Sequence, residues 1–167
     1  MPYSKYNKYK MSSDSQNIKH KNWMRLAIKE AEKAYSAKEV PIGAIIVKDN
    51  IIIGKGYNQC EGLQDPTAHA EILAITSAAN SLKSMRLIDC YMYVTKEPCP
   101  MCAGALINAK IKFIGFGSYD EKEGCCGSLY QICRDPRFKH QLIVKGGIFE
   151  PYCTDLIKEF FRNKRRN

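Results

Sequence analysis

Two short stretches decide the fold: DPTAHAE at residues 65–71 and EPCPMC at residues 97–102. Each stretch comes after a β-rich run and leads into a run of good helix formers, which predicts a strand, a connection and a helix start. His69, Cys99 and Cys102 therefore lie at or near helix starts. Two successive strand-to-helix units of this kind are typical of an α/β domain.

The remaining segments complete this pattern. Apolar residues recur at helical spacing from Trp23 to Tyr35. Two β-rich runs flank Asp49 and Asn50, as in a hairpin, and Thr67 is available to cap the helix that follows it. The first expected helix starts at residue 23, and the later helices cover 68–81, 98–109 and 154–165. The expected strands cover 41–47, 51–57, 87–95, 111–117 and 142–144. This order predicts an α/β fold, a three-layer α/β/α sandwich with a mixed central sheet.

Length and composition favour one domain. The chain has 167 residues, of which 45% are hydrophobic, and this suits a single core. We expect a single domain at residues 23–167 after a flexible, basic leader at residues 1–22, although Met11 could be the true start. No run approaches the roughly 18 apolar residues of a membrane span, and the opening residues lack the apolar segment of a signal peptide. These features predict a soluble, cytoplasmic protein without a membrane partner.

The net charge of +9 is concentrated at the two ends of the chain. Residues 1–22 carry five lysines and Asp14, and residues 158–167 carry five basic residues and Glu159, so each end has a net charge of +4. Such ends either contact the phosphates of a nucleic acid or are solvated tails. Charge alone does not separate these two interpretations.

Cysteine spacing indicates a metal site. Cys99 and Cys102 are three residues apart, so both sulfurs lie on one face of a helix, whose N-terminus favours their thiolate forms. His69 can supply a third ligand, which leaves the fourth tetrahedral position of a zinc ion open to water. Zinc lowers the pKa of such a water towards about 7, and Glu71 is the candidate proton carrier. Because residues two apart on a regular helix face different ways, we expect His69 at the helix cap, slightly outside the helix.

Other uses of these cysteines are possible. A CxxC pair alone also occurs in redox motifs and structural zinc sites, and Cys125 and Cys126 could complete a closed four-sulfur site. A closed site would not need an unligated carboxylate such as that of Glu71, so the combination of HxE with CxxC favours a catalytic zinc site. The remaining cysteines are interpreted as core or incidental thiols: Cys60, Cys90, Cys133 and Cys153.

At these residues the sequence resembles the bacterial tRNA adenosine deaminase family of the cytidine deaminase-like superfamily. The resemblance covers nearly everything after residue 22. It is carried by residues 23–24, 39–44, 56–58, 65–71, 86–89, 97–105, 127–129 and 155–166. The fold that it implies is the cytidine deaminase-like form of the α/β/α sandwich.

The resemblance implies an enzyme that converts the wobble adenosine, at anticodon position 34 of an arginine tRNA, to inosine. It implies one Zn²⁺ per subunit, with His69, Cys99 and Cys102 as ligands and Glu71 as the proton shuttle. It also implies a homodimer in which both subunits border each RNA site, and a terminal helix that contacts the anticodon loop. The substrate-binding residues that it implies are Asn58, Ala70, Asp120, Phe161, Arg162 and Arg165.

The sequence departs from the family pattern at three places. Tyr119 stands in place of an arginine, Lys96 in place of a leucine, and Cys125-Cys126 in place of small residues. None of these departures touches the expected chemistry, but each could change the affinity for RNA or the choice of tRNA.

Two other functions remain open at this point. A free-base or nucleotide deaminase of the guanine or cytosine type would share the HxE and PCxxC elements and the fold. A non-catalytic, zinc-stabilised RNA-binding module would bind RNA in a salt-sensitive manner, and Glu71 would be dispensable in it.

Overall fold

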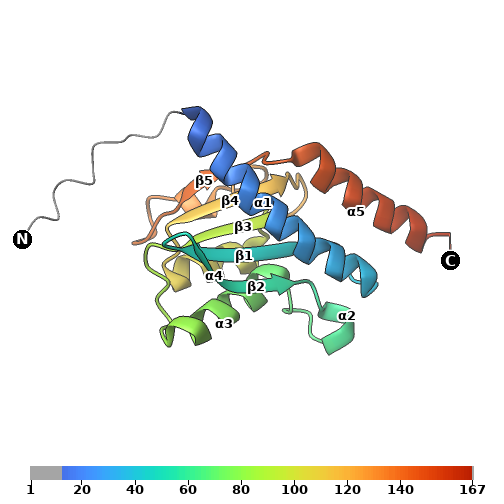
Figure 1. The fold of residues 1–167 in the computed structure, drawn as a ribbon, viewed down its shortest axis with the longest axis horizontal. Coiled ribbons are helices and arrows are strands. Elements are labelled where there is room, and N and C mark those ends of the chain that lie inside the picture. Colours follow the sequence, from blue (N-terminus) through green and yellow to red (C-terminus); the bar gives the residue numbers. More distant parts are fainter. Residues whose placement is uncertain (1–12, 167) are drawn as a thin grey trace, which may run out of the picture.

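The computed structural model of the protein describes residues 13–166 (Figure 1). Its helices are α1 (Ser13–Ser36), α2 (Cys60–Leu63), α3 (Ala70–Leu82), α4 (Pro100–Ala109) and α5 (Glu150–Lys164). Its strands are β1 (Gly43–Lys48), β2 (Ile51–Tyr57), β3 (Tyr91–Lys96), β4 (Phe113–Ser118) and β5 (Ile143–Lys145), and a 3₁₀ turn, η1 (Ile132–Arg134), precedes β5. None of the helices in this part of the chain is both long enough and apolar enough to cross a membrane.

The five strands form one mixed sheet in the order β2-β1-β3-β4-β5. The two pairs β1–β2 and β1–β3 are antiparallel, whereas β3–β4 and β4–β5 are parallel. The predicted hairpin is confirmed, because Asp49 and Asn50 join β1 to β2 and both have positive φ, at 50° and 61°. Asn and Asp tolerate this backbone conformation better than most residues, which suits them to a tight hairpin turn.

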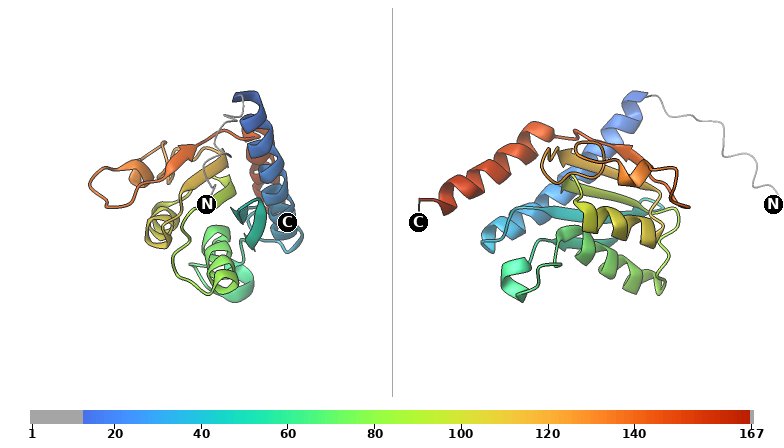
Figure 2. Two further views of the ribbon diagram at one scale, coloured as in Figure 1. Left: turned by 60° about the vertical axis from the view of Figure 1, so that its left-hand side comes forward. Right: turned by 180° about the vertical axis from the view of Figure 1, so that it is seen from behind.

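Helices cover both faces of the sheet, so the predicted three-layer α/β/α sandwich is confirmed (Figure 2). Alternation along β1 shows how the two layers form, because successive side chains of a strand point to opposite faces. Ala44 and Ile46 pack in the core under α3 and α4, whereas Ile45 and Val47 pack in the core under α1. All four side chains are buried, as expected for a central strand.

The topology gathers the ends of several strands at one edge of the sheet. Strands β3 and β4 are parallel, so both end at this edge, and the amide of Glu97 donates to the carbonyl of Ser118 across it at 2.8 Å. Strand β2 ends at the same edge, because it is antiparallel to β1, which is antiparallel to β3. Helix α4 follows β3 directly and begins at this edge, and α3 also begins there, because after α2 the amide of Gln59, just past β2, donates to the carbonyl of Ala68 at 3.0 Å. The two sequence motifs lie at these helix starts.

Helix α1 begins ten residues before the predicted start at Trp23, so residues 13–22 are helical rather than part of a flexible leader. The apolar pattern from Trp23 onward did not predict this extension, because the residue that holds the extension against the sheet, His20, is polar. The Nδ1 atom of His20 forms a hydrogen bond of 2.9 Å with the hydroxyl of Tyr93. The His20 ring stacks on the ring of Phe113, with the ring centroids 4.9 Å apart. Residues 1–12 of the predicted leader lie outside the described residues.

Two other predicted boundaries are wrong. Strand β3 begins at Tyr91 rather than Leu87, because Asp89 adopts a positive φ of 58° that breaks the extended backbone. Helix α5 begins at Glu150 rather than Thr154, and it contains Pro151 in its first turn. A proline is tolerated there because the first amides of a helix have no partner within the helix.

Helix α1 packs so closely on the sheet that Gly43 leaves no room for a side chain. A Cβ at this position would lie 2.2 Å from the amide nitrogen of Ala31 and 2.3 Å from the carbonyl of Ala27, both backbone atoms of α1. Gly43→Ala should therefore lower the free energy of unfolding by about 1–3 kcal/mol or more, measured by urea denaturation. The matched control is Gly104→Ala in α4, where nothing lies within 4 Å and alanine should add about 0.5–1 kcal/mol. Equal effects of the two substitutions would contradict this packing.

Candidate active site

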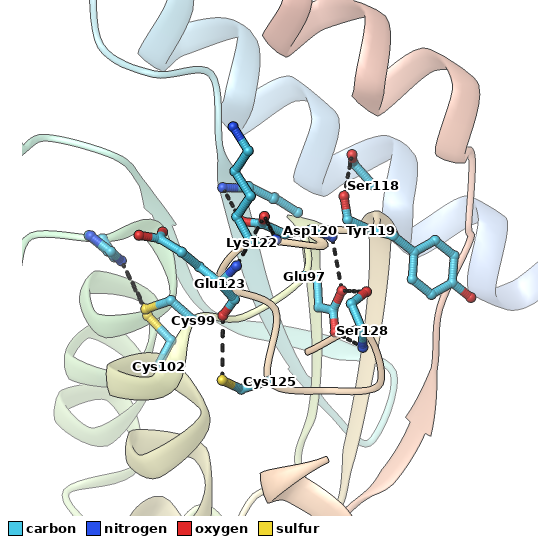
Figure 3. A network of polar contacts seen from close by, with 12 residues as sticks. Glu97, Cys99, Cys102, Ser118, Tyr119, Asp120, Lys122, Glu123, Cys125 and Ser128 are labelled. Carbon is cyan, nitrogen blue, oxygen red and sulfur yellow. Dashed lines mark hydrogen bonds and ion pairs between the residues drawn. The ribbon is translucent and has the colours of Figure 1, made fainter. Parts of the chain in front are cut away.

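Three side chains at the shared sheet edge form a compact group. The Nδ1 atom of His69 lies 3.6 Å from the Sγ atom of Cys99 and 3.5 Å from the Sγ atom of Cys102. Within residues 13–166, this is the one group of three or more His, Cys, Asp or Glu side chains that could hold a metal ion. Figure 3 shows the two cysteines at the start of α4.

The helix starts explain how these side chains meet. His69 is the N-cap of α3 and Cys99 is the N-cap of α4, and both have extended backbone with ψ of 153° and 175°. The expected position of His69 at the cap is confirmed. Thr67 does not cap α3, because its hydroxyl and amide both donate to the carboxylate of Asp65, at 2.7 Å and 2.8 Å. Cys102 lies one turn into α4, on the same side as Cys99.

The group fits a zinc ion by both geometry and chemistry. Ligand atoms held about 2.0–2.3 Å from a tetrahedral zinc lie roughly 3.5–3.8 Å from one another, and the two nitrogen–sulfur distances here are 3.6 Å and 3.5 Å. A hydrogen bond from Cys102, together with His69, lowers the pKa of the Cys99 thiol to about 4, and the same bond raises the pKa of Cys102. The thiolate is the metal-binding form of cysteine. This donor set therefore suits zinc.

Glu71 lies in the first turn of α3, two residues after His69, and is buried with 4% of its surface exposed. Burial raises the pKa of its carboxyl group, which also lies close enough to Cys102 to form a hydrogen bond. A carboxyl group beside a candidate metal site can accept a proton and return it, and a raised pKa favours that role.

Asn58 and Ala70 also lie at this edge. Asn58 directly follows β2 and is buried, and the next residue, Gln59, donates its amide to the carbonyl of Ala68 at 3.0 Å. Asn58 is thus held beside the start of α3. Ala70 is the first residue of α3, and its fully buried side chain belongs to the core on that face of the sheet.

A second buried carboxylate, which the sequence analysis did not assign, organises the loop after β4 (Figure 3). Glu97 accepts hydrogen bonds from the amides of Asp120 (2.9 Å), Cys126 (3.0 Å) and Ser128 (2.9 Å), and from the hydroxyl of Ser128. Its side chain is 2% exposed. Because Glu97 immediately precedes the PCxxC motif, it ties this loop to the start of α4.

Asp120 is held in this loop by an ion pair. Its carboxylate lies 2.7 Å from the ammonium of Lys96 and accepts the amides of Lys122 and Glu123. Burial alone would raise the pKa of Asp120, but these partners together lower it. The lysine that departs from the family pattern therefore fixes a residue that the sequence analysis assigned to substrate binding.

The three predicted RNA contacts lie at the C-terminal end of α5, with Phe161 and Arg162 in its last turn and Arg165 as its C-cap. Phe161, Arg162 and Arg165 are all exposed, whereas the neighbouring Phe160 is buried and packs edge-on against Tyr35. The last turn of α5 also approaches α2, where Lys164 lies 3.9 Å from Glu61. These contacts place the basic end of α5 near the turn that follows Asn58.

The other cysteines do not join the candidate metal site. The sulfur of Cys126 lies 3.3 Å from that of Cys133, and the thiol of Cys125 donates to the carbonyl of Glu123. The rival four-sulfur site is therefore not supported. The thiols of Cys90, Cys133 and Cys153 are buried in the core, and Cys60 donates to Asn58 at 3.6 Å.

Comparison with known proteins agrees with this geometry. The MafB19-like deaminase family profile matches residues 18–165. A tRNA-specific adenosine deaminase from Bacillus subtilis is 43% identical over 86% of this chain and 89% of its own length. The solved structure of a tRNA:A34 deaminase, studied for A-to-I editing at the wobble position, shares 38% identity at a TM-score of 0.77 and covers 81% of this chain and 98% of that one. The structure of a guanine deaminase from Bacillus subtilis shares 39% identity at a TM-score of 0.58, over 60% of this chain and 64% of that one.

The fold, the His/Cys/Cys group and the profile match define this protein as a deaminase of the cytidine deaminase-like fold. More particularly, the chain belongs to the family of tRNA-specific adenosine deaminases, whose members match it over most of both lengths.

The Glu97 network allows a direct test. Glu97→Ala leaves three amides without their acceptor, of which only that of Cys126 is buried, and one buried unpaired donor costs about 1–3 kcal/mol, so the free energy of unfolding should fall by about that amount. The measurement is urea denaturation of the zinc-loaded protein. Glu121→Ala is the matched control, because Glu121 is an exposed glutamate of the same loop and its removal should change stability by no more than about 0.5 kcal/mol. A small effect at Glu97 would show that the loop does not depend on it.

Proposed function

We propose that this protein is a zinc-dependent tRNA adenosine deaminase that converts the wobble adenosine, anticodon position 34 of an arginine tRNA, to inosine. The observation that carries the proposal is the group formed by His69, Cys99 and Cys102 with the buried carboxyl group of Glu71 beside it. The family membership supports the substrate class, because relatives that match most of this chain are tRNA-specific adenosine deaminases.

His69, Cys99 and Cys102 would hold one zinc ion per subunit, which when bound activates a water for attack on C6 of adenine. Glu71 takes a proton from the attacking water and passes protons to N1 of the base and to the departing amine. One water is consumed, ammonia leaves, and inosine remains. Burial of Glu71 favours this role because its raised pKa lets the same carboxyl group take up and release the proton.

Base and RNA recognition would come from the residues around this centre. The target base must leave its stack to reach the buried Glu71, so a single-stranded anticodon loop is a suitable substrate. We assign Asn58, Ala70 and Asp120 to the base and its neighbours. Phe161, Arg162 and Arg165, exposed at the C-terminal end of α5, would contact the loop by stacking and by phosphate pairing.

The assembly and location follow from the family in the same way. We propose a homodimer in which both subunits border each RNA site. A tRNA-modifying enzyme acts where tRNA matures, so we place the protein in the cytoplasm.

The test is inosine formation in an arginine-tRNA anticodon stem-loop by the zinc-loaded protein, with free guanine, cytosine and adenosine as parallel substrates. The proposal predicts inosine at the wobble position and no turnover of the free compounds. Turnover of free guanine with the RNA unchanged would make the protein a free-base deaminase, the class of a partial structural match. Binding of RNA without any deamination would indicate a non-catalytic module.

Within this assay, Glu71→Ala should abolish inosine formation, because the variant lacks the carboxyl group that takes the proton from water and passes protons to the base and the departing amine. The zinc content of the variant, measured by atomic absorption, should equal that of the wild type, since Glu71 is not among the three metal-binding side chains. Inosine formation by this variant would refute the assignment of Glu71.

A further inference from the structure

A buried carboxylate outside the proposed chemistry contacts the residue assigned to the base. Glu39 lies between α1 and β1 and is 3% exposed. Its Oε2 atom accepts hydrogen bonds from Nδ2 of Asn58 and from the amide of Glu61, both at 3.3 Å. Its Oε1 atom accepts the amide of Gly62 at 2.6 Å. One side chain therefore holds both the Asn58 amide group and the backbone of α2.

This contact fixes which way the Asn58 amide group points. An asparagine side chain has a donor end and an acceptor end of nearly the same shape, and either could turn toward a neutral partner. A carboxylate only accepts, so Glu39 selects the donor end. The thiol of Cys60 donates to the other end, Oδ1, at 3.6 Å. The two partners together hold Asn58 in one of its two amide orientations.

We propose that Glu39 is a positioning residue for base recognition: it sets the orientation of the Asn58 amide group, so that the hydrogen-bonding atoms offered to the flipped base are always the same. This assignment rests on the proposed function, in which Asn58 binds the base. Glu39 itself does not contact the substrate. Glu39 acts on the reaction only through Asn58, so the effects of substituting the two residues on kcat/KM should not add.

The experiment is a double-mutant cycle on kcat/KM for inosine formation in the anticodon stem-loop, using the zinc-loaded wild type, Glu39→Gln, Asn58→Ala and the double variant. Glutamine keeps the shape of Glu39 but offers a donor as well as an acceptor, so Glu39→Gln should lower kcat/KM by roughly 10-fold to 100-fold, the range for one charged hydrogen bond. In the Asn58→Ala background, the same change should lower kcat/KM by less than about twofold.

A matched control separates positioning from support of the fold. Glu30 is also a buried glutamate, on α1, but it pairs with Lys33 at 2.8 Å, and Glu30→Gln should leave kcat/KM unchanged. The zinc content of Glu39→Gln should match that of the wild type, and the variant should remain folded at the assay temperature with a modestly lower midpoint of thermal unfolding, because its side-chain NH2 group must face one of the two α2 amides that Glu39 accepts. Loss of zinc or of folded protein in this variant would show a structural brace and overturn the proposal.

The outcomes distinguish this proposal from the proposed function. An active wild type in which the Glu39 and Asn58 effects simply add overturns the positioning role and leaves the deaminase assignment standing. A wild type that leaves the RNA unchanged overturns the proposed function and, with it, this assignment. Loss of the Glu39 effect in the Asn58→Ala background supports both.

Discussion

The candidate active site depends on one constraint of the sheet, the alignment of the ends of β2 and β3 at a common edge. Strand β3 leads directly into α4, and the segment after β2, which contains α2, returns to the same edge before α3 begins, so the N-termini of α3 and α4 are brought together. His69 and Cys99 are the two N-cap residues, and Cys102 lies one turn into α4. A helix N-terminus also favours negative charge through its free amides and its dipole, which suits cysteine thiolates.

Three buried glutamates at this edge have different roles. Glu71 has its pKa raised by burial, which suits proton transfer. Glu39 and Glu97 are equally buried, but backbone amides of α2 and of the loop after β4 satisfy them. Burying a carboxylate is costly unless donors surround it, so such residues are retained where they hold backbone in place. Glu39 holds α2 beside Asn58, and Glu97 holds the loop that contains Asp120.

Local pattern was enough to predict the architecture and the central residues. The Asp49-Asn50 turn marked the hairpin, and the spacing of HxE and CxxC placed their side chains at two helix starts. Contacts between distant residues were not accessible in this way. The stacking of His20 on Phe113 extends α1 beyond its apolar stripe, and the partners of Glu97 are backbone amides 23 to 31 residues away. Neither leaves a periodic signal in the sequence.

The central claim is that one zinc ion is held by His69, Cys99 and Cys102 with its fourth position open. X-ray absorption at the zinc edge of the loaded protein tests it most directly, because sulfur ligands lie at about 2.3 Å and nitrogen or oxygen ligands at about 2.0–2.1 Å. The account predicts two sulfur ligands and two lighter ones, one of them from solvent. Four sulfur ligands would contradict it, because the ion would then be closed off by cysteines and could not activate water.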